Sequence, residues 1–167
     1  AEEKLAGSTS AAKLSEGVTL RQAGFRQADI MLLGPAPLHA VPYAVENDLL
    51  LPVFNRENAQ WVSDAAQKLG KTARVQLKID TGMNRIGVKP GADLAALLAY
   101  LRELGNLKVA GVFTHFSTAT YTEDPFVYEQ YDLFCKRNRI SRTILSVGAI
   151  LLGIANSEAW WGLLAIA

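Results

Sequence analysis

The sequence predicts an α/β protein in which parallel β-strands alternate with helices. Short apolar runs alternate with amphipathic runs along the chain, and turn-forming residues separate them. This order is typical of βαβ units. The 167 residues are 50% hydrophobic and 20% charged, a composition typical of one folded domain with a substantial core. Because such crossovers are right-handed, the sheet should be either doubly wound or part of a barrel.

The first elements follow from capping residues and chain breakers. Ser15 is placed to cap a helix, and Gly24 is placed to end it. Pro42 weakens the helical pattern that follows the next strand. The expected elements of this half are a helix over 15–22, a buried strand over 28–33, a weak helix over 40–46 and a strand over 49–54.

The later elements show clearer signals. Asn55 is a helix cap, Gly70 ends the four-residue periodicity that follows it, and Pro125 begins a further helix. The apolar face of that last helix is expected to consist of Tyr128, Tyr131 and Cys135. The other expected elements are a helix over 55–69, a strand over 73–79, a helix over 92–104, and strands over 109–113 and 150–155.

Charge and cysteine content exclude several classes of protein. The formal net charge is +1 and the basic residues are dispersed, so no nucleic-acid surface is predicted. The lone Cys135 favours a reducing, cytoplasmic compartment and a buried structural thiol. The charged first residues are unlike a secretory signal. Asn156 and Glu158 interrupt the apolar tail over 144–167, which favours a buried strand over a membrane span.

The most informative segment runs from Lys78 to Val88 (KIDTGMNRIGV). It follows a strand-like run, and in α/β folds the active-site residues lie at the C-terminal ends of strands. Lys78 and Arg85 lie on either side of a glycine turn, so both can face one anionic ligand. Asp80 can order that turn by accepting hydrogen bonds from backbone N–H groups.

This segment resembles the signature of the alanine racemases, which use pyridoxal 5′-phosphate to interconvert L- and D-alanine for peptidoglycan precursors. Residues 111–116 (GVFTHF) are similar to the same family, and residues 155–157 (ANS) are similar over a shorter stretch. The resemblance implies a (β/α)8 TIM barrel followed by a β-rich domain. Residues 1–167 are then expected to be an incomplete N-terminal barrel domain, without its first strand, its last strand and the C-terminal β domain.

The resemblance also assigns roles to individual residues. Arg85 is expected to contact the ring oxygen of the cofactor and to help place the substrate carboxylate, which suits the forked donors of an arginine. His115 is expected beneath the cofactor ring, and Asn156 and Ser157 are expected at its phosphate. The catalytic residues of this chain are therefore expected to be Arg85 and Lys78.

Lys78 alternates with apolar Leu77 and Ile79, so its side chain should point to the opposite face, the barrel interior. A buried lysine beside Arg85 would place two cations together, which is unfavourable. Many members of the family carbamylate the matching lysine with CO₂, and the resulting anion accepts hydrogen bonds from the arginine. The resemblance implies this modification at Lys78, provided that its ammonium group does not face solvent.

Other motif matches conflict with their surroundings. Residues 80–82 spell the aspartic-protease triplet DTG, but the flanking pattern is α/β and Met83 replaces a small residue. Residues 70–72 (GKT) resemble the end of a P-loop, but they follow a helix instead of a strand. No Cys/His cluster has zinc-like spacing, so no metal is expected. His39 lies among prolines and is expected at the surface.

The chain also departs from the family pattern. Gly153 stands where the family usually has a histidine. The family's lysine that binds the cofactor covalently has no counterpart, because Lys4 and Lys13 lack its sequence context. In the family's homodimer the tyrosine base comes from the partner subunit's C-terminal domain. The chain alone is therefore expected to be inactive. Two alternatives remain: a racemase of different amino-acid specificity, and a non-catalytic half-barrel that binds a small anion or a partner.

Overall fold

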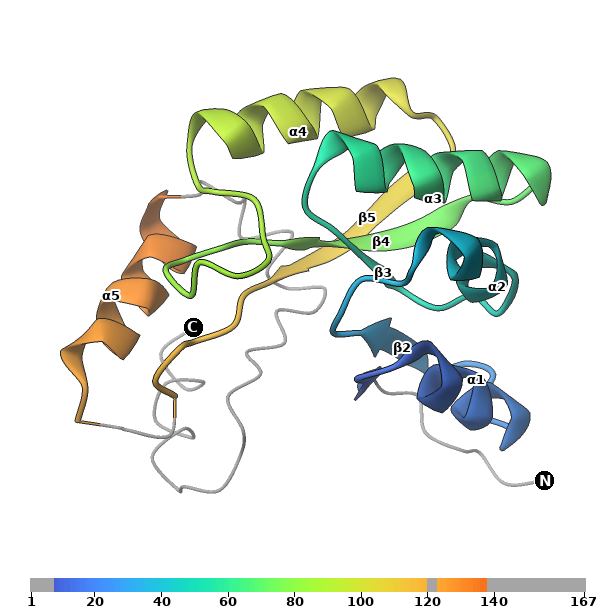
Figure 1. The fold of residues 1–167 in the computed structure, drawn as a ribbon, viewed down its shortest axis with the longest axis horizontal. Helices are drawn as coiled ribbons and strands as arrows, with labels where there is room; N and C mark the ends of the chain where they lie inside the picture. The colour runs from blue at the N-terminus through green and yellow to red at the C-terminus, as the bar shows by residue number, and fades with distance from the viewer. Residues whose placement is uncertain (1–7, 120–122, 138–167) are drawn as a thin grey trace.

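The computed structural model describes residues 8–119 and 123–137, which form an open parallel sheet covered by helices (Figure 1). The elements in chain order are β1 (Ser8–Ala11), α1 (Leu14–Gln22), β2 (Asp29–Leu32), the 3₁₀ helix η1 (Leu38–Ala40), α2 (Val41–Glu46), β3 (Leu51–Val53), α3 (Arg56–Lys68), β4 (Ala73–Lys78), α4 (Ala92–Glu103), β5 (Leu107–Phe113), α5 (Pro125–Asp132) and the π-helical turn η2 (Leu133–Arg137). The predicted alternation of strands and helices is confirmed.

The strands lie side by side in chain order. β1 pairs with β2, and β3, β4 and β5 pair in sequence, all of them parallel. Backbone bonds from Leu32 N to Leu50 O and from Leu50 N to Ile30 O, both 2.9 Å, join the two groups. A doubly wound sheet would reverse its strand order near the middle, so the described strands form an arc of a barrel.

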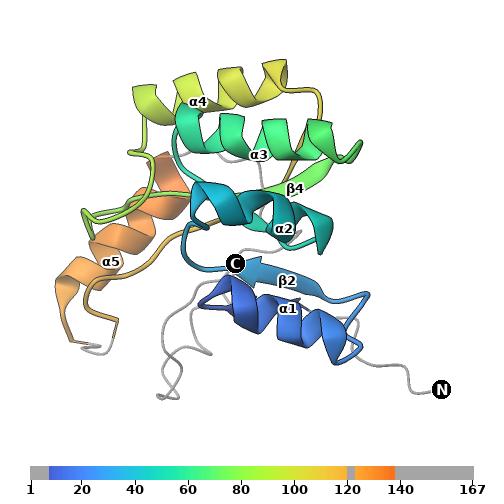
Figure 2. The ribbon, with the colours of Figure 1, turned by 45° about the vertical axis from the view of Figure 1, so that its right-hand side comes forward.

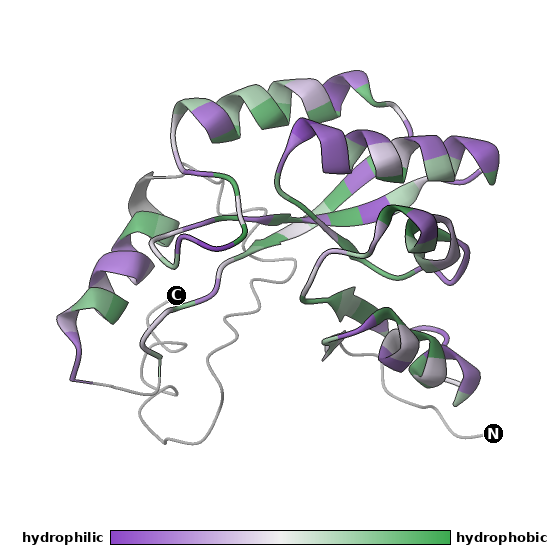
Figure 3. Cartoon of the chain, in the orientation of Figure 1, coloured by the Kyte–Doolittle hydropathy of each residue, from purple (hydrophilic) through white to green (hydrophobic). Residues whose placement is uncertain are grey.

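Apolar side chains are buried on both faces of the arc. The larger cluster lies between the sheet and the helices and includes Val62, Val75 and Leu97. A smaller cluster on the inner face contains Met31, Leu50 and Phe113. Figure 2 shows α1 to α4 stacked in chain order along one side of the sheet. Figure 3 shows hydrophobic and hydrophilic positions mixed along β4 and many hydrophilic positions on α3; five of the six residues of β4 are nevertheless buried.

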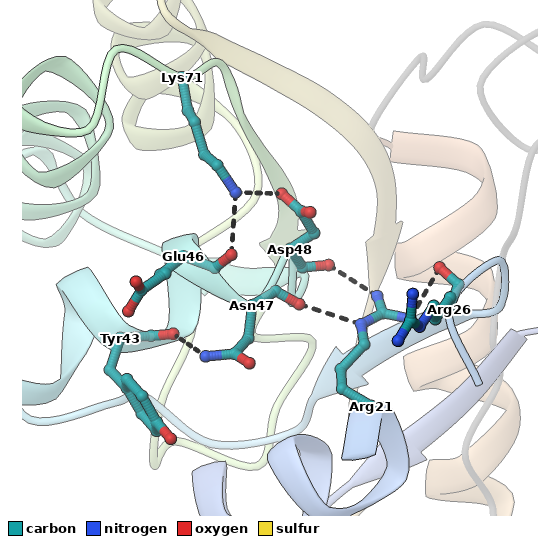
Figure 4. A network of polar contacts seen from close by, with 7 residues as sticks. All are labelled: Arg21, Arg26, Tyr43, Glu46, Asn47, Asp48 and Lys71. Atoms are coloured by element: carbon teal, nitrogen blue, oxygen red, sulfur yellow. Dashed lines mark hydrogen bonds and ion pairs between the residues drawn. The ribbon is translucent and has the colours of Figure 1, made fainter. Parts of the chain in front are cut away.

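Arg21 fastens α1 to the turn between α2 and β3 (Figure 4). Its Nε donates to Asn47 O at 3.0 Å and its Nη2 donates to Asp48 O at 2.8 Å. Its Nη1 donates to Ala28 O, also at 2.8 Å. Lys71 Nζ donates to the Asp48 carboxylate at 3.1 Å from the other side. Because the acceptors of Arg21 are backbone carbonyls, its role in this network is structural.

Several local expectations are confirmed. Asn55 caps α3 by accepting from Asn58 N at 2.7 Å, and Gly24 and Gly70 follow α1 and α3 with positive φ angles. Pro42 was expected to weaken the helix over 40–46, but it lies in the first turn of α2, where a missing N–H does no harm. The surface histidine that was expected, His39, is exposed, whereas the single thiol, Cys135, was expected to be buried and is half-buried against the main core.

Two expectations are wrong in detail, and one strand, β1, was not predicted. β1 lies in a small, polar segment that has no apolar strand pattern. α1 begins at Leu14, and Glu16 Oε2 accepts from the two backbone N–H groups just before it, Ala12 N at 2.8 Å and Lys13 N at 3.3 Å, so Ser15 is not the cap. Tyr128 is 54% exposed, and α5 packs instead through Val127 and Gln130. The strand expected over 150–155 lies outside the described residues.

In the part of the chain that the structure describes, no helix combines the length and the apolar character that a membrane crossing requires. The apolar tail over 144–167 is outside that part.

Candidate active site

The loop after β4 is organised by the carboxylate of Asp80, as its sequence predicts. Asp80 Oδ1 accepts from Gly82 N and from Asn84 N, each at 3.0 Å. Its Oδ2 lies 3.0 Å from Lys89 Nζ. Burial by itself raises the pKa of Asp80, but the hydrogen bonds from Asn84 and Gly82 and the charge of Lys89 outweigh it and hold that pKa below its usual range.

The same loop returns to the strand from which it starts. Asp80 N donates to Val88 O and Val88 N donates to Lys78 O, each at 2.9 Å. Of the loop residues, Gly87 comes closest to the end of the strand, and its backbone φ angle is +146°. Arg85 lies between these fixed ends and is exposed. Within residues 8–119 and 123–137 its guanidinium has no hydrogen-bond or ion-pair partner, so its donors remain available to a ligand.

Lys78 points to the inner face of the arc, as expected from its alternation with Leu77. Its side chain is only 4% exposed, and its Nζ donates to Leu33 O at 3.0 Å. The same nitrogen lies 5.2 Å from the centroid of the Phe113 ring. Burial lowers the pKa of Lys78, the charge of Arg85 lowers it further, and Asp80 opposes the shift.

His115 follows β5, whose last residue, Phe113, pairs in register with Lys78. The carbonyl of Phe113 accepts from Ile79 N at 2.8 Å, so the ends of β4 and β5 are held together. His115 is half-buried. Burial lowers its pKa, followed by the positive charges of Arg85 and Lys78. The register of β4 and β5 therefore brings the loop of Arg85, the end of Lys78 and His115 to the same edge of the sheet.

This region suits an anionic ligand. Arg85 offers a guanidinium without a partner among the described residues, Lys78 is a buried amine, and the lowered pKa of His115 favours a neutral imidazole near pH 7. Among the described residues there is no group of His, Cys, Asp and Glu that could hold a metal ion. Two further expected ligands, Asn156 and Ser157, lie outside the described residues, as does Gly153.

Sequence reasoning missed two polar contributors to this region. Lys89 pairs with the buried carboxylate of Asp80. Its place just after Val88, at the end of the same motif, could have predicted that it belongs to this loop. Gln130 is fully buried on α5 and contacts the loop after β4 through Thr81. No sequence pattern pointed to Gln130, because a lone glutamine in a helix is usually a surface residue.

A parallel strand arc covered by helices places the chain in the class of (β/α)8-barrel proteins, and the cationic groups lie at the edge where such barrels carry their sites. The particular family follows from comparison with known proteins. The chain belongs to the alanine racemase family, because the family model "Alanine racemase, N-terminal domain" matches residues 1–162.

Individual relatives support the same assignment. The chain is 38% identical over 159 residues to the alanine racemase of Desulfovibrio desulfuricans, covering 92% of this chain and 41% of that protein. The structure resembles the alanine racemase of Clostridium difficile 630 with a TM-score of 0.76 at 30% identity, covering 88% of this chain and 38% of that one.

A histidine racemase from Leuconostoc mesenteroides subsp. sake is also similar, with a TM-score of 0.70 at 30% identity, covering 79% of this chain and 35% of that one. These likenesses confirm the predicted partial TIM barrel. The chain spans between 32% and 41% of the length of the first curated relatives that it matches.

Proposed function

We propose that this chain is the part of an alanine racemase barrel that binds one edge of pyridoxal 5′-phosphate and the substrate carboxylate. The observation that carries the proposal is the convergence of Lys78, Arg85 and His115 at the ends of β4 and β5 in a member of this family. The whole protein would interconvert L- and D-alanine in the cytoplasm and so provide D-alanine for peptidoglycan precursors.

The donor set fits this cofactor, whose phenolic oxygen and phosphate are both anionic. When bound, pyridoxal phosphate supplies an electron sink for negative charge at the substrate Cα. Arg85 would bind the ring oxygen and orient the substrate carboxylate through its forked donors. His115, held neutral by burial and by its cationic neighbours, would lie beneath the ring. Asn156 and Ser157 would hold the phosphate.

Equilibrium dialysis of the chain against pyridoxal phosphate tests this assignment. Arg85→Gln should weaken binding about tenfold, since a charge-assisted hydrogen bond contributes about 1.5–3 kcal/mol. The matched control is Arg56→Gln, because Arg56 lies over the Tyr100 ring on the helical side and should not affect binding. Equal affinity in the wild type and in Arg85→Gln would contradict the proposal.

Lys78 is proposed to carry a carbamate. Its lowered pKa increases the fraction of neutral amine, which attacks CO₂; a nitrogen–carbon bond forms, one proton leaves, and the amine becomes an NH–COO⁻ group. The remaining N–H can keep the bond to Leu33 O, while the new carboxylate faces Arg85. This exchange replaces a repulsive pair of cations with an attractive pair.

Carbon-13 NMR of the chain in ¹³C-bicarbonate tests the modification. A carbamate carbonyl signal is expected in the wild type and in Lys71→Met, because Lys71 is a surface lysine paired with Asp48. The signal should be absent from Lys78→Met. Its persistence in Lys78→Met would show that another amine is modified.

The chain alone is proposed to be inactive, because the covalent lysine and the tyrosine base of a partner subunit are expected from other parts of a homodimeric racemase. Incubation with L-alanine and pyridoxal phosphate should give no D-alanine above the level of free cofactor. Racemisation above that level, or a borohydride-stable cofactor label on a lysine of this chain, would overturn this part of the proposal.

A second candidate is a racemase for another amino acid, which the likeness to a histidine racemase supports. Competition of amino acids in the dialysis experiment separates the two. Stronger retention of cofactor with alanine favours the first candidate, and stronger retention with a larger amino acid favours the second. Binding of simple anions without preference for pyridoxal phosphate would instead indicate a non-catalytic half-barrel.

A further inference from the structure

One face of α5 contacts the loop after β4, and the same face reaches the loop after β5. Phe126 and Gln130 lie four residues apart on α5, and residues with this spacing share one side of a helix. In Figure 1, α5 lies at the end of the sheet where the loop after β4 reaches farthest. α5 is therefore placed to fix the relative position of the two loops that carry Arg85 and His115.

Gln130 uses both ends of its amide in this contact. Its Oε1 accepts from Ser117 N at 3.0 Å and from Ser117 Oγ at 3.1 Å. Its Nε2 donates to Thr81 Oγ1 at 3.4 Å, and the Thr81 hydroxyl is hydrogen-bonded to Thr114 Oγ1 at 2.8 Å. Gln130 is 0% exposed, so water does not replace these bonds, and each would be costly to break.

Phe126 adds a steric contact to the same loop. Gly82 has a φ of +137°, and a Cβ there would stand 2.7 Å from Cζ of Phe126. The ring therefore occupies the space that a side chain at Gly82 would need. Gly82 follows Thr81 directly, so the apolar contact and the amide bond fix adjacent residues of the loop.

We propose that Gln130 is a positioning residue that sets the separation of the two loops and thereby keeps Arg85 facing His115. Thr81, its partner on one side, follows Asp80 in the turn that presents Arg85. Ser117, its partner on the other side, lies two residues after His115. The inference rests on the proposed function for the roles of Arg85 and His115, but the geometry that it describes does not require the cofactor.

A double-mutant cycle read by NMR titration of His115 tests the inference. The chain has two histidines, and His39 is exposed and supplies an internal reference. In CO₂-free buffer, where Lys78 remains an amine, Arg85→Gln should raise the pKa of His115, because it removes one of the two cations, Arg85 and Lys78, that lower it. In Gln130→Met, which removes all three hydrogen bonds of the amide at similar side-chain volume, this rise should fall by about half or more.

The control is Gln67→Met, the same substitution at an exposed position of α3, which should leave the rise unchanged. An undiminished rise in folded Gln130→Met would overturn the inference, even if the variant were less stable. If Gln130→Met does not fold, Thr81→Val replaces it, because it removes the hydroxyl to which Gln130 donates, and Thr114→Val is its control, because the same hydroxyl is also bonded to Thr114 Oγ1.

A reduced rise in folded Thr81→Val would support the inference, and an unchanged rise would overturn it. The experiment contains no cofactor. Failure of pyridoxal phosphate to bind would therefore contradict the proposed function and leave the result of the cycle intact.

Discussion

Gly87 lies against the backbone of Asp80, so closely that a Cβ at Gly87 would stand 2.6 Å from Asp80 N. This approach closes the loop after β4 next to the bridge between Ile79 and Val88. Arg85 is presented from a loop whose two ends are in contact, and its position is therefore set by backbone packing. The glycine is required there by the close approach and also by its positive φ.

Gly87→Ala should destabilise the chain by at least about 1–3 kcal/mol, because it combines an unfavourable backbone conformation with a collision against Asp80. Urea unfolding followed by circular dichroism measures the loss. Gly105→Ala is the control, because no atom lies within 4 Å of a Cβ at that position. Equal stability of Gly87→Ala and wild type would show that the loop does not close as described.

Asp80→Asn should cost about 1–3 kcal/mol at pH 7, since it removes the buried charge that faces Lys89. The pKa of Asp80 is depressed in the folded chain, so its contribution is present above the unfolded carboxyl pKa of about 3.9 and is lost as the pH falls through the folded value. The variant should therefore lose less stability than the wild type on acidification.

Urea unfolding between pH 7 and pH 3 measures this difference. Asp64→Asn is the matched control, because Asp64 is exposed and its bond from Gln60 Nε2 can also be accepted by asparagine. Parallel acid profiles for the wild type and Asp80→Asn would contradict the electrostatic role of Asp80.

Lys78→Met should change the alkaline stability profile in CO₂-free buffer. Because the folded pKa of Lys78 is lowered, the unfolded chain binds more protons than the folded chain as the pH approaches the ordinary lysine value of about 10.4. The free energy of unfolding of the wild type should gain from Lys78 as the pH rises through this window. Lys78→Met should lack that gain, and Lys71→Met should retain it. The same alkaline slope in Lys78→Met would show that Lys78 does not titrate as described.

Arg21→Met should destabilise the chain by about 2–3 kcal/mol, because the backbone carbonyls of Asn47, Asp48 and Ala28 would lose a charged donor. Thermal unfolding measures the effect. Arg26→Met is the control, because Arg26 is exposed and contributes its backbone carbonyl to this network. Similar melting temperatures for the two variants would mean that the Arg21 network adds little to stability.

The alternation of strands and helices and the loop around Asp80 could be predicted because their signals are local. Apolar runs, caps such as Asn55, and an aspartate before a glycine act within a few residues. β1 could not be found this way, because its pairing with β2 is made by backbone groups and its side chains carry no apolar pattern. Its position depends on the neighbouring strand.

The candidate site was predictable to the extent that one sequence segment holds it. Lys78 and Arg85 share the loop after β4, and His115 follows the next strand. Gln130 was not predictable, because its burial depends on the face that α5 turns toward the loops. The tyrosines of α5 suggested the wrong packed face for this helix. A tyrosine side chain has a polar hydroxyl and can therefore also lie at an exposed position, as Tyr128 does.

The central claim is that Arg85 and His115, with Lys78 behind them, face one anionic ligand, and NMR of the labelled chain during addition of pyridoxal phosphate tests it most directly. We expect the ring signals of His115 to shift with saturation while those of His39 stay fixed, and we expect Arg85→Gln to require about tenfold more ligand. Equal shifts of both histidines, or a His115 response that is unchanged by Arg85→Gln, would contradict the claim.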